Sequence, residues 1–392
     1  MSKPPAALAA AFIDRVRSVV GDAPSIGLHE PEIDETDKAL VAECLDSTFV
    51  SSVGPFVTRF EQEIAAFTGA AHAVAVSNGT SALHLALVLA GVQPGDEVLV
   101  PALSFVATAN AVSHAGARPH FVDSDPVTMG LDVGALATVI AGFERTPAGL
   151  RNPATGARVS AIVPMHTFGH PVDLVALVAL ADEHGLVVVE DAAESLGSFV
   201  GAQHTGTFGR LGILSFNGNK IVTTGGGGMI LTDDAELARR AKHLTTTAKV
   251  PHEWEFEHDE VAWNYRMPNL NAALGVAQLA KIDRFLAQKR VLADRYAAAF
   301  ADLDGMSVKL EPPGTTSNYW LVAISLDDPD IVVRDQILRA SNDAGLHCRP
   351  FWNLLSDQRM YRDAQHGELV VARSLMDSVI NVPSSPRLAT AR

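Results

Sequence analysis

The sequence predicts an α/β fold, with a large domain built on a mostly parallel sheet and a smaller C-terminal α/β domain. From residue 73 onward, short apolar runs rich in Val and Ile alternate with stretches of helical periodicity. This alternation is typical of parallel strands joined by helices that cover both faces of a sheet. The length of 392 residues exceeds what a single core usually supports, which predicts the additional smaller domain.

Five of the apolar runs end in polar loops, and this convergence predicts a ligand site. The runs are AVAVS from residue 73, EVLVP from 97, SAIVPM from 160, LVVVE from 186 and GILSF from 212. In open α/β sheets, ligands bind at the carboxyl ends of the strands. We therefore expect the five polar loops to meet at one edge of the sheet.

The chain before these runs is predicted to be helical. An amphipathic helix is expected near the N-terminus, and a second helix over 34–47 that Asp34 or Thr36 would cap. A turn at Gly54-Pro55 leads into a third helix over 57–67.

The chain after the runs is predicted to contain one loop, one long helix and the small domain. Residues 245–259 are polar without a clear period, so we expect a loop there, and a single long helix from the following NYRMPN segment to Phe300. We expect residues 1–55 to be an N-terminal segment packing with the small domain, 56–280 to be the large domain, and 281–392 to be the small domain.

Composition and charge exclude several classes of function. A net charge of −15 and a pI of about 5.3 disfavour nucleic acid and anionic membranes as partners. No apolar run approaches the roughly 20 residues of a membrane span. The two cysteines, Cys44 and Cys348, provide neither a disulfide framework nor a Cys-based zinc site. We therefore expect a cytoplasmic protein.

Three of the polar loops carry residues suited to chemistry. In SNGTSALHLAL, Gly79 and Thr80 open a helix whose first turn offers free N–H groups to an anion, although an ordinary capped helix has the same pattern. Asp191 ends a very apolar strand, where a carboxylate needs a cation or a strong donor; a helix cap or a metal ligand are the alternatives. A metal is disfavoured because His166 and His170 are separated by Gly169 and cannot share a helix face.

The third loop, SFNGNKIVTTGGGG, carries a lysine. Lys220 is either a surface side chain beside a flexible turn or an amine held to form a Schiff base, with Ser215 and Asn217 as neighbours. The glycines from 225 to 228 would allow a bulky ligand to approach the backbone closely.

An anion-binding helix start, a buried acid and a later loop lysine are together the parts of a pyridoxal-phosphate enzyme. The segments SNGTSALHLAL, EDAAESLGS, SFNGNKIVTTGGGG and NYRMPNLNAAL resemble the DegT/DnrJ/EryC1/StrS family of nucleotide-sugar aminotransferases, which have fold type I of the pyridoxal-phosphate-dependent transferases. The resemblance extends from about residue 26 to 386. Segments such as PMHTFGHPVD, RPFW and NVPSSP resemble the subgroup that aminates carbon 4 of NDP-4-keto-6-deoxy-N-acetylhexosamines.

The resemblance implies a role for each matching residue. Lys220 would hold the cofactor covalently and move protons, and Asp191 would pair with the ring nitrogen. Asn264 would reach the phosphate bound in a partner subunit, which implies a homodimer with shared active sites. The remaining cofactor contacts would be Gly79, Thr80, Phe105, Ser215 and Asn217. The candidates for substrate binding are His166 and, on the sugar-nucleotide side, Arg349 and Trp352.

Glu194 departs from the pattern of much of the family. Many members have Gln here, which donates a hydrogen bond to the phenolic oxygen of the cofactor. An ionised Glu has no proton to donate. Glu194 is therefore either protonated or directed elsewhere.

The function implied by the resemblance is transfer of an amino group from L-glutamate to the 4-keto sugar. Three alternatives remain. A Rossmann-type sugar dehydratase is disfavoured because no Gly-rich dinucleotide turn precedes Gly79. A pyridoxal-phosphate-dependent sugar dehydratase of the same fold would have His in place of Lys220. A non-catalytic regulator that binds the cofactor has no chemical need for Lys220 and Asp191 together.

Overall fold

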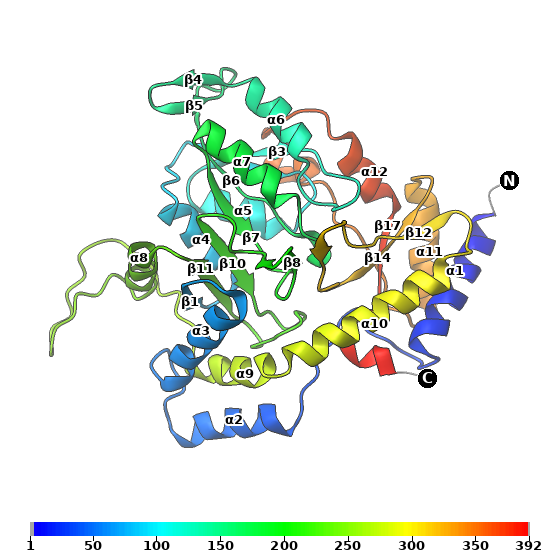
Figure 1. The fold of residues 1–392 in the computed structure, drawn as a ribbon, viewed down its shortest axis with the longest axis horizontal. Coiled ribbons are helices and arrows are strands. Elements are labelled where there is room, and N and C mark those ends of the chain that lie inside the picture. The colour runs from blue at the N-terminus through cyan, green and yellow to red at the C-terminus, as the bar shows by residue number, and fades with distance from the viewer. Residues whose placement is uncertain (1–3, 391–392) are drawn as a thin grey trace.

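The computed structural model describes residues 4–390 and shows a large α/β body joined to a smaller one by a long helix (Figure 1). The large sheet has the strand order β1-β11-β10-β7-β6-β2-β3-β16. All neighbours from β10 to β16 are parallel, whereas β11 is antiparallel to both β1 and β10. The predicted fold class, with its mostly parallel sheet, is confirmed.

Each of the five predicted apolar runs forms a strand of this sheet. The strands are β1 (His72–Val76), β2 (Glu97–Pro101), β6 (Arg158–Ile162), β7 (Val187–Asp191) and β10 (Leu211–Ser215), and β11 (Gly228–Thr232) follows the glycine-rich loop. Two further strands, β3 (Arg118–Val122) and β16 (Gln365–His366), lie at one edge. Their polar sequences, RPHFV and QH, carry no apolar strand signal.

Helices from the crossovers cover the sheet. They are α4 (Gly79–Leu89), α5 (Val106–His114), α6 (Val133–Ala141), α7 (Leu174–His184) and α8 (Ala235–Thr245). Hairpin β4 (Glu144–Thr146)–β5 (Gly149–Arg151) extends from β6, and β8 (Phe199–Val200), β9 (Gln203–His204) and β13 (Thr315–Thr316) form a separate small sheet.

The N-terminal helices pack on two different parts of the molecule. Helix α1 (Pro5–Val20) lies against α10 and α11, whereas α2 (Glu35–Asp46) and α3 (Pro55–Thr68) lie against α9. The Asp34 side chain caps α2 and forms a capping box with Asp37. Within the predicted N-terminal segment of residues 1–55, α1 and α2 therefore contact different parts of the fold. The domain boundary at residue 55 stays a prediction.

The prediction of a single long helix that begins in the NYRMPN segment is wrong in two respects. Residues 264–268 are extended, and the helix is divided into α9 (Asn269–Leu279) and α10 (Ile282–Phe300), which follow each other closely in Figure 1. The break is at Ala280 and Lys281. There the Lys281 Nζ lies 2.5 Å from Asp37 Oδ2, so the residue that precedes α10 is anchored on the start of α2.

The small body is an antiparallel sheet flanked by helices. Its strand order is β12 (Met306–Val308), β14 (Val322–Leu326), β17 (Val379–Val382) and β15 (Arg349–Pro350). Its helices are α11 (Ile331–Asp343) and α12 (Val370–Ser378). Short 3-10 turns occur in both bodies: η1 (Thr167–Gly169) in the large one, and η2 (Leu355–Asp357), η3 (Arg359–Tyr361) and η4 (Pro386–Thr390) in the C-terminal part of the chain. The chain between β15 and α12 contributes β16 to the large sheet, which ties the two bodies together.

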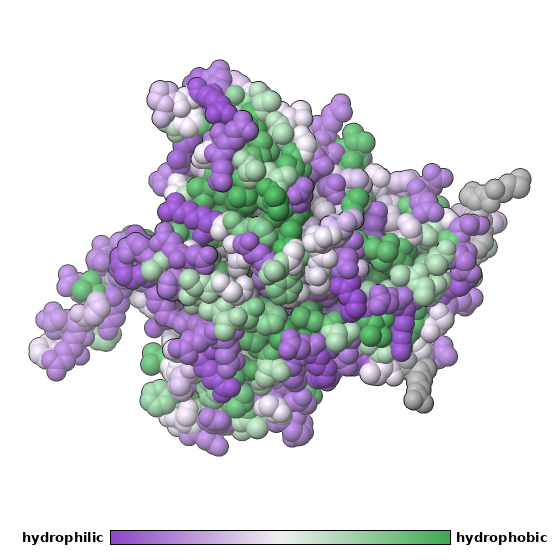
Figure 2. Space-filling model, in the orientation of Figure 1, coloured by the Kyte–Doolittle hydropathy of each residue, from purple (hydrophilic) through white to green (hydrophobic). Residues whose placement is uncertain are grey.

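The polar segment from 245 to 259 is irregular, as predicted, and projects from the body beside α8 (Figures 1 and 2). Its surface in Figure 2 is mostly hydrophilic, although Trp254 and Phe256 are exposed on it. Across residues 4–390, no helix is both long enough and apolar enough to span a bilayer.

Candidate active site

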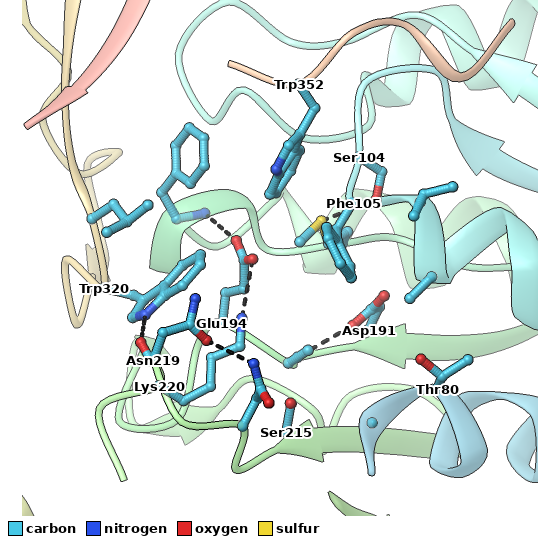
Figure 3. Close-up of a pocket in the computed structure, with 18 of the residues that line it drawn as sticks. Thr80, Ser104, Phe105, Asp191, Glu194, Ser215, Asn219, Lys220, Trp320 and Trp352 are labelled. Atoms are coloured by element: carbon cyan, nitrogen blue, oxygen red, sulfur yellow. Dashed lines mark hydrogen bonds and ion pairs between the residues drawn. The ribbon is translucent and has the colours of Figure 1, made fainter. Parts of the chain in front are cut away.

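A cavity of about 920 Å³ lies at the carboxyl ends of the parallel strands, between the large sheet and the small body (Figure 3). The polar loops predicted to converge do meet here. Ten of the twelve predicted site residues line the cavity: Gly79, Thr80, Phe105, Asp191, Glu194, Ser215, Asn217, Lys220, Arg349 and Trp352.

One end of the cavity is formed by the start of α4. Asn78 caps the helix by accepting a hydrogen bond of 2.8 Å from the Ser81 N–H, and the first-turn amides of Gly79 and Thr80 have no intrahelical acceptor. A Cβ on Gly79 would lie 3.0 Å from the Ser215 Cβ, so glycine permits this close approach. The result is a cradle of backbone amides and hydroxyls that suits a phosphate.

Asp191 lies at the end of β7, and no cation within residues 4–390 forms an ion pair with it. The Thr108 hydroxyl donates to its Oδ2 at 2.8 Å, and the Ala193 N–H donates to its Oδ1 at 3.2 Å. Burial raises the pKa of Asp191, and these two hydrogen bonds oppose the rise. A protonated ring nitrogen would give this carboxylate the positive partner that the protein does not supply.

The amine of Lys220 is held between an acid and an aromatic ring. Its Nζ lies 3.2 Å from Glu194 Oε1 and 3.7 Å from the centre of the Trp320 ring (Figure 3). The Trp320 indole N–H donates to the Asn219 carbonyl at 2.8 Å, which fixes the ring under the lysine loop. The geometry contradicts the alternative of a surface lysine, because the Lys220 side chain is only 12% exposed.

Glu194 is directed into the site and is buried. Its Oε2 accepts a hydrogen bond of 3.0 Å from the Phe168 N–H, and its Oε1 faces Lys220. Burial raises the pKa of Glu194 to about 7, although the positive charge of Lys220 lowers it. The carboxyl group can therefore take up a proton near neutral pH, and the alternative in which it points elsewhere is contradicted.

Aromatic side chains form the wall opposite α4. Phe105, which precedes α5, is half exposed, and its ring centre lies 6.0 Å from that of Trp352. The Phe168 ring lies 5.2 Å from Trp352. Phe168 has a φ of 55°, a strained conformation for a bulky residue that turns its N–H toward Glu194.

Among the lining residues that sequence reasoning missed, three matter most for the site: Phe168, Trp320 and Asn381. Phe168 lies in the PMHTFGHPVD segment, whose polar character signalled a site, but nothing in the sequence indicated its positive φ. Trp320 and Asn381 belong to the small body. The sequence around Trp320 is typical of an ordinary strand, and Asn381 opens the NVPSSP segment, which indicated the subgroup without indicating this residue.

Two predicted site residues, His166 and Asn264, lie outside the cavity, and the substrate-binding role expected for His166 is wrong. His166 is fully buried; its Nε2 lies 3.1 Å from Glu190 Oε2, and its Nδ1 accepts from the Val172 N–H. Its ring cannot contact a substrate, because both nitrogens are bonded within the core. Asn264 is exposed, and its Oδ1 accepts from Arg266 at 3.1 Å, so its proposed reach to a partner subunit is not tested by a single chain.

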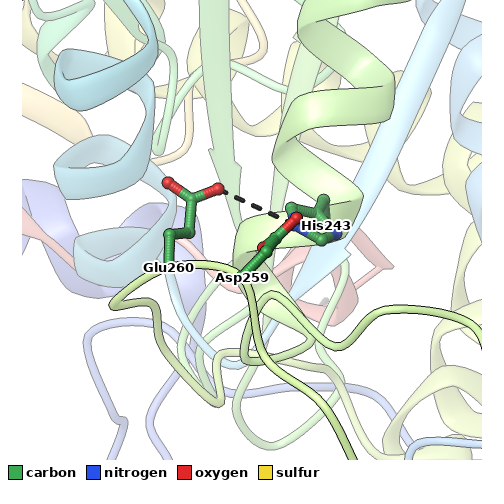
Figure 4. A group of neighbouring side chains, drawn as sticks. All are labelled: His243, Asp259 and Glu260. Carbon is green, nitrogen blue, oxygen red and sulfur yellow. Dashed lines mark hydrogen bonds and ion pairs between the residues drawn. The ribbon is translucent and has the colours of Figure 1, made fainter.

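A separate cluster of His243, Asp259 and Glu260 has side chains close enough to share a cation (Figure 4). His243 Nε2 lies 2.7 Å from Asp259 Oδ1, and Arg240 binds both oxygens of Glu260. Arg240 therefore already supplies the positive charge. The cluster joins the end of the projecting segment to α8.

The cavity residues fit pyridoxal phosphate. That cofactor needs an anion cradle for its phosphate, an acid for its ring nitrogen and an amine for its aldehyde. The start of α4, the cation-free carboxylate of Asp191 and the Lys220 amine supply these three groups in one cavity.

Comparison with known proteins identifies the family. Residues 31–392 match the model of the DegT/DnrJ/EryC1/StrS aminotransferase family. The chain belongs to this family. GDP-perosamine synthase of Caulobacter vibrioides is 35% identical over 95% of this chain and 96% of its own. The putative pyridoxal phosphate-dependent aminotransferase EpsN of Bacillus subtilis is 35% identical, over 86% of this chain and 84% of its own.

A solved structure agrees with this assignment. The aminotransferase TlmJ from Streptoalloteichus hindustanus superposes with a TM-score of 0.83 and 32% identity, covering 92% of this chain and 93% of its own. Members of the DegT/DnrJ/EryC1/StrS aminotransferase family depend on pyridoxal phosphate. The chain is accordingly a sugar aminotransferase of this family with pyridoxal phosphate as its cofactor.

Proposed function

We propose that the enzyme moves an amino group from L-glutamate to carbon 4 of a nucleotide-linked 4-keto-6-deoxy sugar, in the biosynthesis of a bacterial glycan. The observation that carries the proposal is the meeting of the Lys220 amine, the Asp191 carboxylate and the start of α4 in one cavity. Its two buried free cysteines, Cys44 and Cys348, are compatible with the cytoplasm that we propose as its location.

Each residue has a defined task in this proposal. When bound, pyridoxal phosphate supplies an electron-withdrawing ring that stabilises the negative charge formed as a proton leaves the donor carbon. Asp191 keeps the ring nitrogen protonated, and the amides of Gly79 and Thr80 with the Ser215 hydroxyl hold the phosphate. Lys220 takes the proton from the donor carbon and returns it, as a general base and acid.

We propose the 2-acetamido form of the sugar, an NDP-4-keto-6-deoxy-N-acetylhexosamine, as the substrate. The proposal rests on the PMHTFGHPVD, RPFW and NVPSSP segments, all of which contribute residues at or beside the cavity. The rings of Trp352, Phe105 and Phe168 provide an apolar wall for the sugar. A second candidate is the GDP-linked precursor of perosamine, because the Caulobacter relative is named GDP-perosamine synthase.

We also propose a homodimer in which Asn264 of each chain contributes to the other chain's site. Asn264 lies in an extended segment, exposed to solvent, and Trp263 and Tyr265 on either side of it pack against His84 of α4. Because side chains alternate along extended backbone, anchoring the two aromatic rings inward directs Asn264 outward.

A substrate panel tests this function. The purified holoenzyme would be mixed with L-glutamate, and its absorbance spectrum followed for the loss of the cofactor's aldehyde form. A set of UDP- and GDP-linked 4-keto-6-deoxy sugars, with and without a 2-acetamido group, would then be added and the products identified by NMR. Aminated product only from the acetamido sugars supports the proposal, and product only from the GDP-linked 2-hydroxy sugar supports the second candidate. A spectrum that L-glutamate leaves unchanged points to a regulator, and loss of a hydroxyl from the sugar points to a dehydratase.

A further inference from the structure

The sheet of the small body presents two different faces. Ile324 and Ile380, opposite each other on β14 and β17, belong to the core of the small body. Asn381, the next residue on β17, is paired with Ala323 on one side and with Arg349 of β15 on the other. Residues directly opposite each other project from the same side of an antiparallel sheet. Arg349 and Asn381 therefore share the face that borders the cavity, and both line it.

Asn381 has an amide oxygen without a partner. The side chain is 2% exposed, and its Nδ2 has one long contact, of 3.5 Å, with the Pro350 carbonyl. Its Oδ1 is buried and has no hydrogen-bond partner within residues 4–390. An unpaired buried acceptor costs free energy. A ligand that brings an N–H or O–H group to this wall would remove that cost.

Arg349 brings a positive charge to the same wall. Its guanidinium donates to Asn342 Oδ1 at 2.9 Å and to a backbone carbonyl at 2.8 Å, and both acceptors are neutral. No carboxylate in the described part of the chain lies within 4.0 Å of it, whereas the other cation lining the cavity, Lys220, is paired with Glu194. The wall therefore lacks a negative group, and an anionic ligand would supply it.

We propose that Arg349 and Asn381 form the subsite for the amino donor. The Arg349 guanidinium binds a carboxylate, and the Asn381 Oδ1 accepts a hydrogen bond from the amino group of the same molecule. An α-amino acid carries both groups on one carbon, so it matches a cation and an acceptor that stand side by side. The inference rests on the proposed function, which names L-glutamate as the donor.

The position of this subsite suits delivery of nitrogen to the reacting centre. Trp320, two residues before β14 begins, lines the same wall, and its ring lies 3.7 Å from the Lys220 Nζ. An amino acid bound by Arg349 and Asn381 would thus enter from the small body toward the amine that it must replace. The family resemblance implies a place for Arg349 on the sugar-nucleotide side. The subsite assigns Arg349 to the donor instead, and the sugar's phosphates would use cavity surface outside this pair.

The two half-reactions of the holoenzyme test the proposal separately. Conversion of the cofactor by L-glutamate, and the return reaction of the aminated enzyme with the keto sugar, would each be measured as a function of substrate concentration. Arg349→Gln removes a charge-assisted hydrogen bond, so the L-glutamate concentration at half-saturation should rise about 10- to 150-fold. Asn381→Leu removes a neutral one and should raise it about 2- to 12-fold. Neither variant should change half-saturation by the sugar more than about twofold.

Binding of glutarate, measured by calorimetry, separates the roles of the two residues without catalysis. Glutarate has the carboxylates of glutamate but no amino group. Arg349→Gln should weaken glutarate binding, whereas Asn381→Leu should leave it unchanged. Arg339→Gln, an exposed arginine on α11, is the matched control and should affect neither ligand.

Three results would overturn the subsite. In the first, both variants keep the half-saturating concentration of L-glutamate of the wild type. In the second, the half-saturating concentration of the sugar rises instead of that of the donor. In the third, Arg349→Gln leaves glutarate binding unchanged. Failure of the wild-type enzyme to react with L-glutamate would contradict the proposed function instead, and the glutarate measurement would still decide whether Arg349 binds a carboxylate. Asn381→Asp provides a second test of this position if Asn381→Leu fails to fold. It keeps the acceptor but adds a negative charge beside the carboxylate, so it should weaken L-glutamate binding more than Asn381→Leu does.

Discussion

The Lys220 ammonium lies 3.2 Å from the Glu194 carboxylate, and both side chains are largely buried. A buried acid that pairs with the reacting amine differs from the glutamine that many relatives have at this position, because it can exchange a proton. Its second oxygen accepts from the Phe168 N–H, so its position is fixed from both sides. This pair connects the charge on the amine with the protonation of a neighbouring side chain.

Replacement of Lys220 by Ala should lower turnover at least about a thousand-fold. The variant loses both the covalent anchor of the cofactor and the proton carrier, and general acid–base catalysis alone contributes about 10²–10⁴-fold. Steady-state assay of the purified variant measures the loss, and cofactor content by absorbance after denaturation shows whether the cofactor still binds. Turnover near that of the wild type would remove Lys220 from the mechanism.

Asp191→Asn should reduce activity by several orders of magnitude while the cofactor still binds. A neutral amide cannot keep the ring nitrogen protonated, whereas the phosphate cradle at α4 is unaffected. Thr108→Val is the matched control, because it removes one charge-assisted hydrogen bond but keeps the Asp191 carboxylate, so it should cost only about 10- to 150-fold. Equal losses in the two variants would mean that Asp191 acts as a structural residue.

The pKa of Glu194 makes the stability of the cofactor-free protein depend on pH. Burial raises this pKa from 4.5 to about 7 in the folded state, so the folded protein binds the proton more tightly than the unfolded chain. The resulting stabilisation is full below pH 4.5 and is lost as the pH rises through 7. Its size between pH 5 and pH 8 is roughly 2–3 kcal/mol.

Glu194→Gln should remove this dependence. Urea unfolding of wild type and variant at pH 5 and pH 8 gives the free energy of unfolding at each pH. Relative to that of the wild type, the free energy of unfolding of the variant should increase as the pH rises. The comparison within each pH cancels the other titrating groups. A constant difference between the two proteins would show that Glu194 has an ordinary pKa.

Mixed dimers should show whether the site is shared. Asn264→Ala alone should weaken cofactor binding or turnover about 10- to 150-fold, because it loses a charge-assisted hydrogen bond to the phosphate. If Asn264 serves the partner's site, a dimer of one Lys220→Ala chain and one Asn264→Ala chain has one intact site. Random pairing makes about half of the dimers mixed, so activity should recover to roughly a quarter of the wild type. No recovery, with mixed dimers confirmed by mass, would show that Asn264 does not act across subunits.

The sequence allowed the core of the site to be predicted because its signals are local. Gly79, Asp191 and Lys220 each lie at the end of an apolar strand or in the loop that follows it, and the rule that parallel strands end at one edge brings them together. His166 follows a strand in the same way, yet its ring turns inward to Glu190. Side-chain direction at a strand end depends on which partner lies beneath it, and the sequence does not contain that partner's position.

Features that depend on packing between distant segments could not be predicted. Trp320 and Asn381 reach the cavity only because the small body docks against the large sheet. At the break between α9 and α10, Lys281 binds Asp37, which lies in a different helix. Strand β3 pairs with its neighbours β2 and β16, although its short sequence RPHFV mixes polar and apolar residues.

Transfer of a labelled nitrogen is the most direct test of the proposed function. The holoenzyme would be incubated with ¹⁵N-labelled L-glutamate and the UDP-linked 4-keto-6-deoxy-N-acetylhexosamine, and the sugar product examined by NMR. We expect ¹⁵N bonded to carbon 4 of the sugar, with one 2-oxoglutarate formed for each aminated sugar. A product that carries no ¹⁵N, or 2-oxoglutarate formed without an aminated product from any 4-keto sugar in the panel, would contradict the proposed function.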